Sequence, residues 1–219
     1  MTSARERSDP PARLRLDAAR NRERVLVAAR RVFEERGMAF SVEEVAAAAG
    51  VGVGTIYRRF PSKEDLIDAV ALPLHRQTLD LAHRALELPP EAGLEWFIRR
   101  NVAFHAARGL PSRRLWAAPD ASELRREIAS VLGRLVEGAK EAGSLRPEAR
   151  YQDVVVLLWT ITDLVDATHP TAPRIWERHL DLVLDGLRPA PKCSPRALPA
   201  PVSAAKWQRV VEAYRDAGR

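Results

Sequence analysis

The amino-acid sequence predicts an all-α protein with a small N-terminal domain of three helices and a C-terminal helical bundle. Apolar residues recur at helical spacing in most of the chain, and no segment alternates apolar and polar residues as a half-buried strand would. Helix-capping residues precede several of these segments, and proline pairs separate others. A length of 219 residues is sufficient for a small domain with a larger companion.

The chain opens with a basic segment that has no helical pattern. Residues 1–16 mix arginine, aspartate and two prolines, which predicts a disordered basic arm. Such an arm is either a solvated tail or an extension that enters a minor groove of DNA. The first helix is expected over residues 17–36, with Val25 and Phe33 on its apolar face and Gly37 as its C-terminal stop.

Two short helices are expected next. Ser41 and Glu44 have the spacing of a capping box, so a helix should follow Ser41 and end at Gly50. A second short helix is expected over residues 53–60. A helix, a tight turn containing glycine and a second short helix are typical of a helix-turn-helix unit. The apolar residues expected between the two helices are Val45, Ala49, Val51 and Ile56.

The outer side of the second short helix is predicted to bind DNA, because small, hydroxyl-bearing and cationic side chains suit contact with phosphates and base edges. The residues concerned are Gly54, Thr55, Tyr57, Arg58 and Arg59. The alternative is an alanine-rich helical corner whose basic residues are only solvated. Residues 1–63 contain 13 basic and 8 acidic side chains, and the remainder contains 22 and 21. Most of the net charge of +6 therefore lies in the part expected to meet phosphates.

Three short strings in this region match a known pattern. They are Gly50-Val51, Gly54-Thr55-Ile56-Tyr57 and Phe60-Pro61-Ser62-Lys63-Glu64, followed by Leu66. The pattern resembles the tetracycline-repressor (TetR) family of transcriptional regulators, and the resemblance covers residues 20–70. It implies that Tyr57 and Lys63 contact DNA phosphates. Gly52 departs from the family, which often has Ser or Thr as the cap of the second helix; glycine is a weaker cap by a few tenths of a kcal/mol.

A helix is expected to join the two domains, which are residues 17–63 and residues 64–188. Ser62 should cap this helix, and Pro73 should kink or break it. The resemblance implies that the second domain is a helical ligand-binding and dimerisation domain. Further helices are expected over residues 91–107, 122–143, 151–168 and 173–187, with a loop at 108–119.

The C-terminal region, residues 189–219, is expected to be a proline-rich linker followed by one short helix. Five prolines within residues 188–203 predict the linker. Residues 204–215 have an amphipathic pattern that would present Trp207 and Val211 on one side. The TetR resemblance does not extend to this region, so its role is open.

Aromatic residues with polar residues among them predict a ligand pocket in the bundle. The candidates are Trp96, Phe104, His105, Trp116, Trp159 and Asp163. Asp163 and Asp166 share a helix face with Trp159, and their carboxylates either meet a cationic ligand or pair with arginine across an interface. Asp163, Asp166 and His169 also resemble an oxygen and nitrogen ligand set, but no further His or Glu accompanies them, so no metal is predicted.

The last two regular helices are the most apolar in the chain, and two from each subunit would form a four-helix interface. The residues expected at this interface are Trp176, Leu180, Val183 and Leu184. The alternative is that these apolar faces are buried within one subunit. A homodimer is preferred, because a palindromic DNA site is bound by a protein with two-fold symmetry.

The expected function is sequence-specific DNA binding by a regulator, which the resemblance implies is a repressor released by a small, mostly apolar inducer. A constitutive DNA binder or a protein-interaction module without a ligand is the alternative. No nucleophile elbow, phosphate loop or metal spacing occurs, so no catalytic residue and no cofactor is predicted, although Asp163 and His105 could act as an acid–base pair. The single Cys193 and the lack of a long apolar run favour a cytoplasmic protein without membrane contact.

Overall fold

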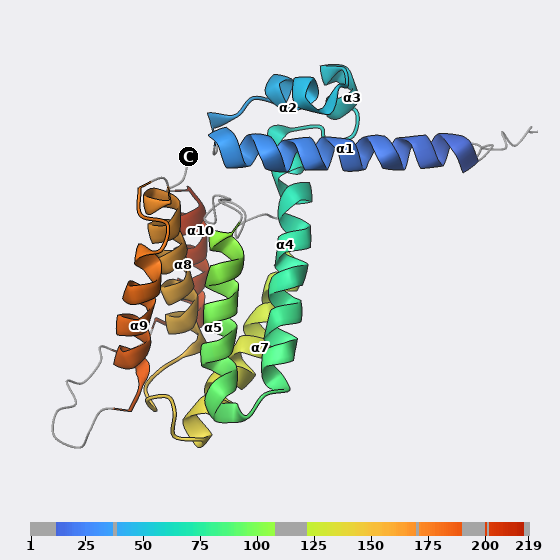
Figure 1. The fold of residues 1–219 in the computed structure, drawn as a ribbon. Coiled ribbons are helices and arrows are strands. Elements are labelled where there is room, and N and C mark those ends of the chain that lie inside the picture. Colours follow the sequence, from blue (N-terminus) through green and yellow to red (C-terminus); the bar gives the residue numbers. More distant parts are fainter. Residues whose placement is uncertain are drawn as a thin grey trace, which may run out of the picture. The chain divides into compact units, whose positions relative to one another are not determined.

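The computed structural model describes residues 12–36, 39–107, 122–169, 171–189, 200 and 202–216. These residues form α-helices, turns and one short 3₁₀ segment, and no strand is present among them (Figure 1). The all-α prediction is therefore confirmed. The chain divides into two compact units, Met1–Leu66 and Ile67–Arg219.

The first unit contains α1 (Ala12–Arg36), α2 (Val42–Ala49), α3 (Val53–Tyr57) and the start of α4 (Lys63–Leu86). Helix α2 packs on α1 and α3 packs on α2 (Figure 1). The aromatic rings of Phe33 and Phe40 lie 4.1 Å apart between centroids, and both side chains are fully buried. The other apolar residues that fill this small core are Val25, Leu26, Ala29, Val32, Val45, Ala49 and Ile56.

Two predicted boundaries in this unit were wrong. Helix α1 begins at Ala12, so residues 12–16 are helical and do not belong to the predicted disordered arm. Arginine, leucine and alanine in this segment are good helix formers, and they follow two prolines that favour a helix start. Helix α3 ends at Tyr57, and residues 58–60 form a turn in which the Phe60 amide donates to the Ile56 carbonyl at 2.8 Å.

Helix α4 runs without interruption through Pro73, so the predicted break does not occur. Proline removes one backbone donor and costs about 3 kcal/mol in a helix interior. The flanking residues Val70, Ala71 and Leu74 are buried. Tertiary packing of these side chains offsets the cost, as it does for most helices in folded proteins.

The second unit is a helical bundle of the remainder of α4 with α5 (Pro90–Ala106), α7 (Ser122–Glu141), α8 (Tyr151–Thr168), α9 (Ile175–Leu187) and α10 (Ala204–Asp216). Helix α5 packs on α7 and α8, and α8 also packs on α9 (Figure 1). One continuous apolar core joins these helices. Its fully buried side chains are Phe97, Ile98, Val102, Ile128, Leu132, Ile161 and Leu180. Helix α8 is buried on most sides, as its composition predicts.

Two positions require glycine, one because two helices approach closely and the other because of its backbone conformation. A Cβ on Gly93 would lie 2.5 Å from the Ala85 carbonyl oxygen, so only glycine lets α5 approach α4 this closely. Gly143 has φ +72° after the end of α7, the left-handed conformation in which glycine commonly terminates a helix. The predicted end of this helix near Gly143 is therefore confirmed.

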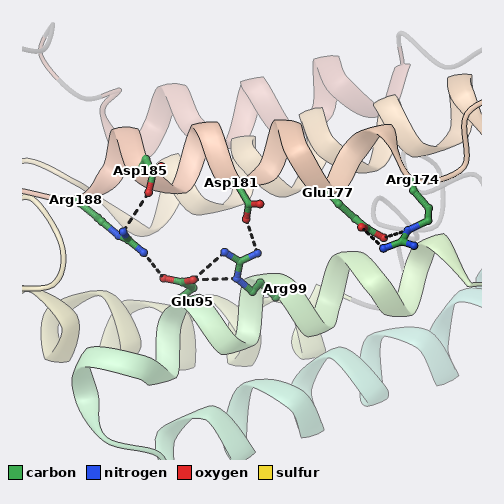
Figure 2. A network of polar contacts seen from close by, with 7 residues as sticks. All are labelled: Glu95, Arg99, Arg174, Glu177, Asp181, Asp185 and Arg188. Carbon is green, nitrogen blue, oxygen red and sulfur yellow. Dashed lines mark hydrogen bonds and ion pairs between the residues drawn. The ribbon is translucent and has the colours of Figure 1, made fainter.

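Ion pairs connect the exposed side of α5 to α9 (Figure 2). Arg99 lies between Glu95 of its own helix, at 2.9 Å, and Asp181 of α9, at 2.7 Å. Arg188 reaches Glu95 at 3.4 Å and Asp185 at 3.1 Å. Partial burial opposes the charged form of Arg99, but hydrogen bonds and charge interactions with Asp181 and Glu95 prevail and raise its pKa.

At the other end of α9, Arg174 and Glu177 form two hydrogen bonds of 2.8 and 2.7 Å. The Arg174 guanidinium lowers the pKa of Glu177, first through these hydrogen bonds.

None of the helices in the described part of the chain has the length and apolar character that crossing a bilayer requires.

Candidate DNA-binding site

The start of α2 is fixed by the predicted capping box. The Glu44 amide donates to the Ser41 hydroxyl oxygen at 3.1 Å, and the Ser41 amide donates to the Glu44 carboxylate at 2.8 Å. These bonds satisfy two amides that a helix start leaves open, and such a cap is worth about 1 kcal/mol. The same arrangement recurs at α4, where Ser62 and Asp65 exchange backbone and side-chain hydrogen bonds.

The turn between α2 and α3 depends on Gly50, which has φ +64°. Its amide donates to the Ala47 carbonyl at 3.2 Å, and the next amide, of Val51, donates to Ala46 at 3.0 Å. Arg24 of α1 donates to the Ala49 carbonyl at 2.7 Å and so satisfies another carbonyl at the end of α2. Gly52 makes no side-chain cap, as the sequence indicates.

Helix α3 is held by one apolar side chain and presents polar ones. Ile56 is 1% exposed and is buried in the first unit, whereas Tyr57 is 43% exposed. Gly54, Arg58 and Arg59 are also exposed, and Thr55 is half-buried. The Arg58 guanidinium donates to the Thr55 hydroxyl at 3.2 Å, so these two side chains lie together on the surface. All five residues predicted to bind DNA therefore have small or polar groups that are at least partly exposed to solvent.

A cleft of about 310 Å³ lies between α1 and α3. Thr55, Arg58 and Arg59 line one side, and Asn21 and Arg22 of α1 line the other. Asn21 and Arg22 were not predicted from the sequence, because no local pattern links α1 to residues more than 30 positions away. Three guanidinium groups and an amide at one cleft suit an oxyanion such as a phosphate.

Lys63 is placed differently from the other predicted residues. Its ammonium donates to the Phe40 carbonyl at 2.7 Å and lies 4.1 Å from the centroid of the Phe40 ring. The side chain is half-buried. Lys63 therefore ties the start of α4 to Phe40, which precedes the N-cap of α2, and it holds the helix-turn-helix unit together in addition to any contact with DNA.

A helix-turn-helix unit with hydroxyl and guanidinium groups on its second helix defines the class of DNA-binding regulators. The family described as "Bacterial regulatory proteins, tetR family" matches residues 25–70, and "Transcriptional regulator SbtR-like, C-terminal domain" matches residues 89–189. A TetR transcriptional regulator from Streptomyces coelicolor is 36% identical over 78% of this chain and 99% of that chain, with a TM-score of 0.53. The chain belongs to the TetR family of DNA-binding transcriptional regulators.

Two further proteins are similar to this chain in fold or in part of the sequence. A tetR-family regulatory protein from Rhodococcus RHA1 shares the fold, with a TM-score of 0.61 and 23% identity over 78% of this chain and 98% of that chain. An HTH-type transcriptional regulator from Staphylococcus aureus (strain USA300) is 41% identical over 54 residues. That match spans 24% of this chain and 29% of the relative's length.

The residues predicted to form a ligand pocket make several separate contacts within the described part of the second unit, and the pocket itself stays a prediction. The Phe104 and His105 rings meet edge to face, with centroids 5.5 Å apart, and the Arg100 guanidinium lies 5.8 Å from the centroid of the Trp96 ring. Trp159 is buried and stacks on Trp207 of α10, with centroids 5.5 Å apart. Asp163 is half-buried and makes polar or ring interactions of its own. The predicted loop residue Trp116 lies outside the described residues.

Two clefts open in the second unit at other places. One of about 510 Å³ is lined by α5, the end of α7 and the end of α9. Its apolar side chains include Leu94, Ile98 and Leu184, and its rim includes Glu95 and Arg188. The other, of about 330 Å³, lies among α7, α8 and α10. None of the predicted pocket residues within the described ranges lines either cleft.

The residues predicted at a dimer interface have two different environments. Leu180 and Leu184 are 0% and 5% exposed within the single chain, so they belong to the core of their own subunit. Trp176 and Val183 are half-buried. For Leu180 and Leu184, the burial favours the alternative in which these side chains are covered within one subunit, because both belong to the apolar core of the second unit.

Proposed function

We propose that this TetR-family regulator is a homodimeric repressor that acts in the cytoplasm and leaves its operator when a small molecule binds the second unit. The observation that carries the DNA-binding site is the exposed polar surface of α3, backed by the buried Ile56. Thr55 and Arg58 are assigned to base edges in the major groove. Tyr57, Arg59 and Lys63 are assigned to phosphates, together with Asn21 and Arg22 of α1.

The proposed dimer surface is the outer face of α8 and α9. Val156 of α8 and Ile175 and Leu182 of α9 are large apolar side chains that are 44%, 49% and 59% exposed. Thr160 lies one turn beyond Val156 and is also exposed. An exposed apolar surface on two adjacent helices fits the four-helix arrangement proposed for two subunits.

Selection of bound fragments from the host genome, followed by binding measurements at several salt concentrations, tests this function. A palindromic site with half-sites about 34 Å apart and a steep loss of affinity with salt is expected. Binding that ignores sequence, or that is insensitive to salt, would contradict the assignment. A sequence-specific binder that no small molecule releases would support the constitutive alternative.

A further inference from the structure

Helix α10 lies outside the family match, which ends at residue 189, yet its Trp207 belongs to the apolar core of the second unit. Trp207 is 6% exposed, and its indole ring is nearly parallel to that of Trp159, with an angle of 9° between the planes. Val210 and Val211 also pack against the core. The C-terminal helix is therefore docked on the bundle through one large aromatic side chain and two small apolar ones.

The cleft of about 330 Å³ beside this helix is formed by three helices, each of which contributes residues one turn apart. Tyr151 and Val155 come from α8, and Trp207 and Val211 come from α10. Arg125, Arg126 and Ala129 of α7 and Gln208 of α10 complete the lining. Two aromatic rings and two valines give the cleft an apolar wall of the size that accepts a small ligand.

The charged groups that line this cleft are the two arginines, and no acidic side chain is among its lining residues. Arg126 is exposed and makes no ion pair with the described residues, whereas Arg125 is half-buried and has interactions of its own. A guanidinium next to an apolar aromatic wall is suited to a carboxylate carried on an aromatic ring. A cationic ligand would meet charge repulsion at the same place.

We propose that the cleft among α7, α8 and α10 binds a small aromatic carboxylate, with its ring against Tyr151 and Trp207 and its carboxylate at Arg126. The site is complete only when α10 is docked. A helix of 13 residues is marginal by itself in water, so the folding of α10 and its docking on the bundle are coupled. A ligand that contacts Trp207, Gln208 and Val211 binds only the docked form and increases its population.

The test uses the full chain and two probes of the same shape, 1-naphthoate and the neutral 1-naphthylmethanol, with calorimetry and hydrogen exchange as readouts. Naphthoate should bind roughly tenfold tighter than the alcohol, as expected for one charge-assisted contact. Arg126→Gln should remove this difference. Arg134→Gln, which changes an exposed arginine of α7 outside the cleft, should retain it. Naphthoate should also slow amide exchange over residues 207–211.

Three outcomes would overturn the proposal: equal affinity for the two probes, unchanged naphthoate affinity in Arg126→Gln, or protection confined to residues of the α5, α7 and α9 cleft. Trp207→Phe keeps an aromatic core residue and should preserve the charge preference with weaker binding, so loss of fold is not confused with loss of the site. These readouts do not involve DNA. If naphthoate does not bind as expected, the proposed operator binding is unaffected. If the protein does not bind an operator, the proposed naphthoate site is unaffected.

Discussion

Arg58 has the clearest role among single residues, because its guanidinium is exposed directly after the end of α3 and donates a hydrogen bond to the Thr55 hydroxyl at 3.2 Å. Arg58→Ala should cost about 1–3 kcal/mol of operator affinity and relax the preference at one base position. Arg22→Ala on α1 is the matched comparison and should weaken binding to all sequences about equally. A binding selection on both variants checks this, and an unchanged preference in Arg58→Ala would assign Arg58 to a phosphate.

Tyr57 offers a test of phosphate contact by a neutral group. Its side chain is 43% exposed, so Tyr57→Phe should leave folding unchanged. Loss of one hydroxyl contact should reduce affinity by about 0.5–1.5 kcal/mol for operator and nonspecific DNA alike. Gel-shift titrations with both DNAs measure the two losses. A loss confined to the operator would mean that Tyr57 reads a base.

Lys63 combines two roles that one variant can separate. Lys63→Met should lower the free energy of unfolding by about 1 kcal/mol, because the contacts with the Phe40 carbonyl and ring disappear. It should also lower the salt slope of DNA binding by about one if the ammonium meets a phosphate. Reduced stability with an unchanged slope would leave Lys63 a structural residue only.

At the scale of elements, the ion pairs between α5 and α9 should contribute little, because they are partly exposed. Asp181→Asn should cost less than about 1 kcal/mol, and the loss should shrink as salt screens the pair. Glu177→Gln is the control, since its partner Arg174 lies at the start of the same helix. Chemical denaturation at low and high salt measures both variants, and a loss well above this bound would show that burial matters more than the exposed fractions indicate.

The sign of the pH dependence at Glu177 follows from its lowered pKa. A carboxylate with a depressed folded-state pKa stabilises the fold above its unfolded pKa, and this contribution is lost as pH falls through the folded value. Because the pair lies at the surface, with Arg174 exposed, the effect should be small. Wild type and Glu177→Gln should therefore unfold alike in strong acid, and wild type should be slightly more stable near neutral pH.

At the scale of the whole molecule, substitutions of two nearby leucines in α9 distinguish an effect on dimerisation from an effect on folding. Leu182 is 59% exposed and Leu184 is 5% exposed. Leu182→Arg should give a folded monomer with weak operator binding, because a charge enters the proposed interface. Leu184→Arg should instead unfold the second unit, since it buries an unpaired charge. Sedimentation and circular dichroism distinguish the two results, and a Leu182→Arg dimer of native affinity would move the interface elsewhere.

A ligand response must obey linkage across the molecule. An inducer that lowers operator affinity roughly 5- to 150-fold must itself bind more weakly to the DNA-bound protein by the same factor. Calorimetric titration of the inducer with and without operator DNA measures its affinity for the DNA-bound and the free protein. Equal inducer affinity in the two titrations would rule out release by this ligand.

The sequence by itself determined the helices, their capping and the polar surface of α3. Ser41 with Glu44, Gly50 and Gly143 set helix ends through hydrogen bonds and φ values that involve residues only a few positions apart. Such short-range interactions are readable in a linear pattern. The family resemblance around Tyr57 added the function, because this pattern belongs to one kind of DNA-binding unit.

Only the tertiary structure decided which apolar and aromatic faces meet. Trp207 stacks on Trp159, which lies 48 positions earlier in the chain. Leu184 is buried, whereas Leu182 is exposed. Asn21 joins the cleft of Thr55, and α4 continues through Pro73 because its neighbours are buried. An amphipathic stripe shows that a face is buried but does not identify its partner, since packing between distant segments depends on the full set of helix positions.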